Sequence, residues 1–103
     1  MAPFRRGQIV NIPCTVQQGA FPDEVLVTID TDTGVVSGFL KSSLVAHHNG
    51  RDYVRGVVVE ATADSVQVRV PGSFFTTAAG LTTVSSGWAR NHFIEGINSP
   101  KLT

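Results

Sequence analysis

The chain has 103 residues, of which 42% are hydrophobic and 16% are charged. This length fits one domain, residues 1–103, which would hide about two-thirds of its extended-chain surface on folding. Eight basic and eight acidic residues give a net charge of zero, which excludes a general attraction to DNA, RNA or anionic lipid. Because a chain with so few charged residues often buries surface between subunits, we expect a homo-oligomer, for example a dimer.

Cysteine content and hydropathy bear on the compartment. Cys14 is the one cysteine, so an internal disulfide is excluded. The first residues lack the apolar run of a signal peptide, and no stretch approaches the ~20 apolar residues of a membrane helix. We therefore expect a cytoplasmic protein that makes no contact with a membrane.

β-branched residues recur at every second position in several short runs, which is typical of half-buried strands. The first run places four side chains on one face, which we expect in the core: Val10, Ile12, Cys14 and Val16. Asn11 and Thr15 fall on the other face. Pro13 has no amide donor, so this strand is predicted to lie at a sheet edge or to carry a bulge.

A second run points Val25, Val27 and Ile29 inward, and a turn over residues 30–34 leads to a third strand at 35–40. The turn contains only two aspartates, too few for a calcium loop, so it predicts a hairpin. Residues 46–54 then read as a linker.

The second half of the chain has the same kind of pattern. A fourth strand is expected at 53–62 and a fifth at 65–70, with Val66, Val68 and Val70 inward, and these two strands should pair as a hairpin. Residues 71–80 interrupt the pattern as an insertion. A final strand is predicted at 81–88.

Residues 6–45 are echoed by residues 55–94. Arg6-Gly7 and the end segment Gly38-Phe39 return 49 positions later as Arg55-Gly56 and Gly87-Trp88, while the valine run that begins at Asp23 returns after 41 positions at Asp64. This internal duplication predicts two copies of one β unit that share a core.

Each copy ends in a pattern that resembles the close of an SH3-like barrel. The segments are Gly38-Phe39-Leu40-Lys41-Ser42-Ser43-Leu44-Val45 and Gly87-Trp88-Ala89-Arg90-Asn91-His92-Phe93-Ile94. The resemblance implies an all-β fold, a small barrel of about six to eight short antiparallel strands, in which a short 3₁₀ turn follows the Gly-aromatic strand. Lys41 and Arg90 stand where peptide-binding SH3 domains have a proline, so recognition of proline-rich peptides is not implied.

Candidate binding residues lie in the insertion and among the basic residues. Phe74 and Phe75 are adjacent, so they cannot both point inward from an extended segment; the loop is either a recognition finger or a cap on the barrel. Arg69, with Lys41 and Arg90 at matching places in the two copies, would suit a phosphate-contacting surface. Trp88, at the position of Phe39, is expected in the core.

Metal binding and catalysis have little support. His47, His48, His92 and Asp52 are zinc ligands by type, but their spacing favours a solvated loop. No nucleophile elbow, phosphate loop or dinucleotide fingerprint is present. We therefore expect no enzyme, metal or cofactor, and predict a non-enzymatic protein-interaction or oligomeric scaffold module that acts through the loop at residues 71–80 and its surroundings. The alternatives are a weak nucleic-acid or anion-binding barrel and a small-molecule-binding barrel.

Overall fold

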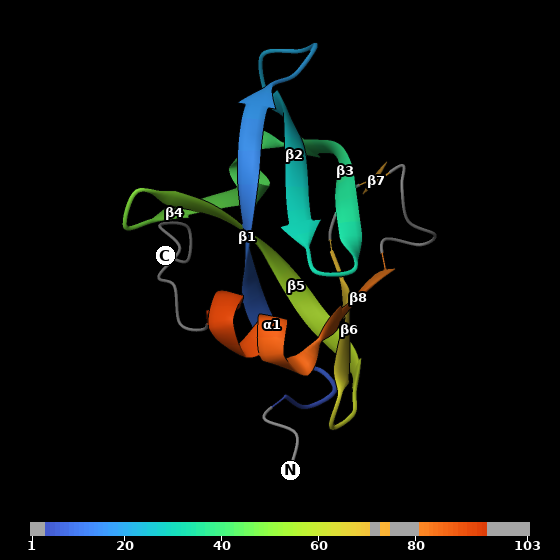
Figure 1. Ribbon diagram of the computed structural model, residues 1–103. Helices are drawn as coiled ribbons and strands as arrows, with labels where there is room; N and C mark the ends of the chain where they lie inside the picture. The colour runs from blue at the N-terminus through green and yellow to red at the C-terminus, as the bar shows by residue number, and fades with distance from the viewer. Residues whose placement is uncertain (1–3, 71–72, 75–80, 95–103) are drawn as a thin grey trace.

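A computed structural model describes residues 4–70, 73–74 and 81–94, and strands dominate these segments (Figure 1). The elements in chain order are β1 (Ile9–Gln18), β2 (Glu24–Thr31), β3 (Gly34–Lys41), the 3₁₀ turn η1 (Ser42–Leu44), β4 (Val45–His48), β5 (Arg51–Ala61), β6 (Ser65–Arg69), β7 (Ser73–Phe74), β8 (Leu81–Ser85) and α1 (Ser86–His92).

All strand pairings are antiparallel, and one sheet runs in the order β7-β3-β2-β1-β5-β6-β8, with β4 paired to β5 off this path. The sheet curls into a small, nearly closed barrel, which confirms the expected all-β fold class. The architecture is compatible with an SH3-like barrel. Among the described residues, no helix has the length and apolar character needed to cross a membrane.

The barrel interior is built from the alternating valine and isoleucine positions. The fully buried side chains are Val10, Ile12, Val27, Ile29, Val54, Val58, Val66, Val68 and Val84. The predicted inward residues of the first, second and fifth strands are all in or against this core, although Cys14, Val16 and Val25 are only half-buried. Each fully buried valine or isoleucine contributes about 1.5–3 kcal/mol of transfer free energy.

Two side chains of the β2–β3 turn tie this hairpin to β8 and so close the barrel seam. The Thr33 hydroxyl donates to the carbonyl oxygen of Thr83, and the Ser85 amide donates to Asp32 Oδ1 at 3.3 Å. The predicted hairpin is therefore confirmed, with Gly34 at φ +142° at its end. The Asp32 carboxylate thus accepts a hydrogen bond from β8, a strand far from it in sequence, rather than from its own turn.

Residues 46–54, expected to link two copies, form a hairpin instead. They comprise most of β4, a turn at Asn49 and Gly50, and the start of β5, with His48 opposite Arg51. Asn49 and Gly50 both have positive φ, 52° and 76°, which is the geometry of a tight two-residue hairpin turn. Asn-Gly therefore reverses the chain within the sheet.

The prediction of a strand at 81–88 is wrong beyond Ser85. The Ser85 side chain accepts a hydrogen bond from the Trp88 amide at 3.1 Å and so caps the helix α1. Gly38 and Phe39 lie in β3, whereas Gly87 and Trp88 lie in α1, so these matched segments are not structurally equivalent. The valine runs matched at 41 positions lie in β2 and β6.

Candidate functional site

The edge of β1 that faces away from β5 changes partner along its length. At Asn11 the main chain exchanges hydrogen bonds with Ile94, at 2.8 and 3.0 Å, and from Thr15 onward the strand pairs with β2. Pro13 lies between these two pairings, where no strand among the described residues pairs with this edge of β1. Its missing amide hydrogen would point to this side, so proline leaves no donor unpaired there.

Pro13 was predicted to mark an edge strand or a bulge, but β1 has neighbours on both sides. It lies instead at an interruption in one edge of an inner strand. Asn11 was expected on the face opposite the core residues and is nevertheless only 4% exposed, because the chain that follows α1 returns along this edge and pairs with it.

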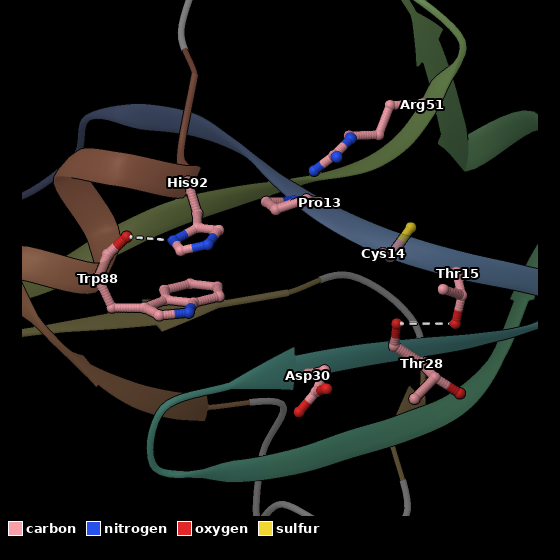
Figure 2. A pocket seen from close by; sticks show the side chains of 8 residues that line it. All are labelled: Pro13, Cys14, Thr15, Thr28, Asp30, Arg51, Trp88 and His92. Carbon is pink, nitrogen blue, oxygen red and sulfur yellow. Dashed lines mark hydrogen bonds between the residues drawn. The ribbon is translucent and has the colours of Figure 1, made fainter.

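A hollow of about 400 Å³ opens over this interruption, between β2 on one side and α1 on the other (Figure 2). It is lined by Pro13, Cys14, Thr15, Thr28, Asp30, Arg51, Trp88 and His92. Its volume falls within the range of about 300–1,000 Å³ that is typical of sites for small ligands. We refer to it as the β1 hollow.

Two aromatic side chains of α1 form one wall of the β1 hollow. The rings of Trp88 and His92 are stacked, with centroids 4.3 Å apart and an interplanar angle of 14°. His92 Nδ1 lies 2.9 Å from the carbonyl oxygen of Trp88, to which it donates, so Nε2 remains available to a ligand. Trp88 is half-buried and packs against the core, with Phe93 edge-on to its ring.

Charged groups of opposite sign flank the hollow. Figure 2 shows Arg51 and Asp30 on opposite sides, with the Trp88–His92 stack beside the space between them. Within the described part of the chain, neither residue forms an ion pair. Both are exposed, and the hydroxyls of Thr15 and Thr28 line the same hollow.

Cys14 lies in the lining but is a poor nucleophile. Burial raises the pKa of its thiol to about 12, and the negative charge of Asp52 adds to this effect. Cys14 and Asp52 are cross-strand partners, and the Asp52 carboxylate is hydrogen-bonded to His47 Nδ1. Across the strands, the Asp52 carboxylate lies between the Cys14 thiol and the His47 imidazole. The arrangement therefore favours the neutral thiol and works against thiolate chemistry.

A second feature is a row of side chains on the outer surface of the barrel. Ile9, Val57, Arg69 and Leu81 are partners in register across β1, β5, β6 and β8, and their neighbours on each strand point inward. Ile9 is 53% exposed and Val57 is 41% exposed. Arg55 is exposed two positions from Val57 and on the same face. These five residues are called the outer row below.

The predicted basic residues are not brought together as a symmetric pair. Lys41 ends β3, near the top of Figure 1, whereas Arg90 is on α1 in the lower half. Both are exposed, as is Arg69 at the end of β6. Of the predicted set, only Arg69 belongs to the outer row.

The insertion at 71–80 falls mainly outside the described residues. Ser73 and Phe74 form β7, whose partners on β3 are Phe39 and Gly38. Phe75 lies outside the part of the chain that the structure describes. The interpretation of this loop as a finger or a cap thus remains a prediction.

The four residues considered for zinc are divided between two regions. His47, His48 and Asp52 belong to the β4–β5 hairpin, whereas His92 stacks on Trp88. No group of three histidine, cysteine or carboxylate side chains that could hold a metal is present within residues 4–70, 73–74 and 81–94.

Residue-based reasoning missed the β1 hollow, because its lining comes from β1, β2, β5 and α1 and no short motif contains it. One signal was present: a proline within a strand requires an edge without a partner, and such an interruption can leave space. Comparison of the chain with models of protein families, with curated proteins and with solved structures finds no match. Function must therefore be argued from the surfaces themselves.

Proposed function

We propose that this protein is a non-enzymatic interaction module, an SH3-like barrel that binds a protein partner through the outer row. The supporting observation is the register that joins exposed Ile9 and Val57 across neighbouring strands. Directly opposed residues have Cβ atoms about 4.5–5.5 Å apart, so these two side chains make one continuous apolar patch. Isolated exposed apolar residues are ordinary, whereas a joined patch with basic margins is typical of a contact surface.

The margins of the patch define the chemistry of the partner. Arg55 and Arg69 are exposed, and within the described residues neither forms an ion pair. Guanidinium groups bind carboxylates in a planar, paired geometry and are enriched at interfaces. The partner therefore presents apolar side chains flanked by aspartate or glutamate.

A second copy of the chain fits this surface less well. A twofold contact through the outer row would bring the arginines of both copies into one interface, with Glu60 the acidic residue nearby in β5. Stable interfaces bury about 1,200–2,000 Å² in total, far more than two or three small apolar side chains supply. The contact we propose is thus a transient one with another protein.

A selection from a random peptide library on the immobilised full chain tests this proposal. We expect the selected peptides to combine apolar with acidic residues, and to bind Val57→Lys about tenfold or more weakly than wild type. Val35→Lys is the matched control, because Val35 is also an exposed strand valine, at 55%, but lies in β3 outside the outer row. Equal binding by wild type and Val57→Lys would contradict the proposal.

Nucleic acid is the competing ligand for the same arginines. Contacts with phosphates release counterions, so oligonucleotide binding would weaken steeply with salt and depend on Arg69 rather than Val57. Titration of a mixed-sequence single strand at low and high salt distinguishes the two. Strong, salt-sensitive binding that survives Val57→Lys would replace the protein partner with nucleic acid. Light scattering on the same samples detects self-association.

A further inference from the structure

We infer that the β1 hollow binds a small zwitterion, a free α-amino acid or a close analogue, with its carboxylate toward Arg51 and its ammonium group toward Asp30. This site is separate from the outer row: none of its lining residues belongs to that row. It would be a small-molecule function in addition to the proposed protein contact.

The interruption in β1 builds the hollow into the strand pairing of the fold. Pro13 needs no hydrogen-bond partner on the open edge, and the chain is bonded on either side of it, at Asn11 to Ile94 and from Thr15 to β2. The hollow is already present among the described residues without a ligand. A preformed cavity avoids the free-energy cost of ordering a loop on binding.

The charges select the class of ligand. Arg51 offers a fork of donors suited to a carboxylate, and His92 Nε2 and the Trp88 indole N–H lie on the adjoining wall. An anion alone would be repelled by Asp30, and a cation alone would be repelled by Arg51 (Figure 2). A ligand with both charges satisfies both side chains.

The remaining lining suits a compact apolar group. Pro13 and the ring edges of the Trp88–His92 stack supply apolar surface, while Thr15 and Thr28 supply hydroxyls. The Thr15 hydroxyl already donates weakly to the Thr28 carbonyl oxygen, at 3.5 Å. Because the neutral Cys14 thiol is unreactive, we expect the ligand to bind reversibly and to leave unchanged.

Four probes separate the contributions of the two charges: leucine, N-acetylleucine, leucinamide and inorganic phosphate. Each is titrated into the ¹⁵N-labelled full chain, with Trp88 fluorescence as a second readout because the chain has one tryptophan. We expect leucine to shift the amides of Cys14, Thr15 and Thr28. N-acetylleucine, which lacks the ammonium group, and leucinamide, which lacks the carboxylate, should bind about tenfold or more weakly.

Two variants test which residue binds each charged group of the ligand. Arg51→Gln should abolish the preference for leucine over leucinamide, and Asp30→Asn should abolish the preference for leucine over N-acetylleucine. Arg55→Gln and Asp23→Asn are matched controls, since both original residues are exposed and lie outside the hollow. The amide spectrum of each variant reports whether the fold is intact.

Three results would overturn the inference: no shift with leucine, equal binding of all three leucine compounds, or phosphate binding as tightly as leucine. The last of these would make the hollow a simple anion site. Val57→Lys should bind leucine as tightly as wild type while losing the peptide contact. Failure of the proposed protein contact and failure of the zwitterion site can therefore be distinguished.

Discussion

β3 in the first half of the barrel and β8 in the second half each lead into a helical turn, but the two turns are held differently. η1 spans three residues, has no side-chain cap and buries none of its residues. α1 spans seven residues, begins at a serine cap and buries Ala89 completely. The second turn is thus anchored to the core, and its anchored position places Trp88 and His92 beside the β1 hollow.

The two hairpin joints also differ. The β1–β2 loop brings the Gly19 amide to the carbonyl oxygen of Glu24 at 3.0 Å. The β5–β6 joint has a comparable backbone hydrogen bond, from the Thr62 amide to the Ser65 carbonyl oxygen at 2.8 Å. It also has side-chain bonds, since Thr62 Oγ1 accepts from the amides of Asp64 and Ser65 at 3.2 and 3.1 Å. Both hairpins are therefore closed through the backbone, and the β5–β6 hairpin is reinforced by a threonine hydroxyl.

Of the substitutions that test the difference between the two turns, Phe93→Ala should lower the free energy of unfolding the most. Phe93 is 8% exposed and lies edge-on to both Phe4 and Trp88, at 5.8 and 5.7 Å between ring centroids. Truncation of a buried phenylalanine costs about 3–5 kcal/mol. Leu44→Ala in η1 should change the free energy of unfolding by less than about 0.5 kcal/mol, because Leu44 is 44% exposed. Urea unfolding measures both; equal losses would show that the two turns are anchored alike.

Gly19→Ala should be the next most disruptive change. A Cβ atom at this position would lie 2.6 Å from the backbone oxygen of Glu24, closer than non-bonded atoms tolerate. We expect a loss of about 1–3 kcal/mol as the loop shifts to relieve the overlap. Ala20→Ser, at an exposed position in the same loop, is the control. A neutral Gly19→Ala variant would mean that the joint is flexible enough to open without loss of stability.

Ser85→Ala should have an intermediate effect, because it removes the cap of α1. The expected cost is about 1 kcal/mol, the usual value for an N-cap hydroxyl. Lys41→Ala tests the corresponding position of η1, which has no side-chain cap, and should be close to neutral. Thermal unfolding followed by Trp88 fluorescence provides the measurement. If both variants behave alike, capping does not account for the difference between the turns.

The smallest expected effect near neutral pH is the contribution of Cys14 ionisation to the stability of the fold. Its folded-state pKa is raised from 9.0 to about 12, so the neutral thiol is favoured in the fold. Its contribution to stability is therefore fully present below pH 9 and is lost as the pH rises from there toward 12. Unfolding of wild type and Cys14→Ser across this range measures the difference.

Reactivity gives an independent check on the same thiol. Because the folded protein holds little thiolate at pH 8, alkylation should be slow compared with the urea-unfolded chain. Asp52→Asn should speed alkylation modestly, since it removes the second cause of the raised pKa. Rapid alkylation of the folded wild type would contradict the assignment.

Much of the barrel could be read from alternation alone. Val27 and Ile29 in β2 and Val66 and Val68 in β6 are buried as predicted, because a strand with one covered face must place every second side chain inside. The hairpin at residues 32–33 was likewise foreseen from its turn residues.

The errors fall where the same residues could form two structures. Residues 86–88 continue a strand pattern, yet the Ser85 cap and the burial of Ala89 against the core turn them into a helix. Asn49-Gly50 marks a turn in either interpretation, and only pairing between β4 and β5 distinguishes a hairpin from a linker. Local pattern leaves both choices open, and packing decides them.

The sequence by itself determined a β-rich chain of zero net charge, the inward positions of most strands and the presence of a proline that interrupts hydrogen bonding. Such properties follow from composition and from the two-residue period of a strand. Tertiary structure alone decided that Arg51, Asp30, Trp88 and His92 surround one hollow, and that Ile9 and Val57 share one face. These groupings depend on strand register and on the return of the chain after α1, which relate residues far apart in sequence.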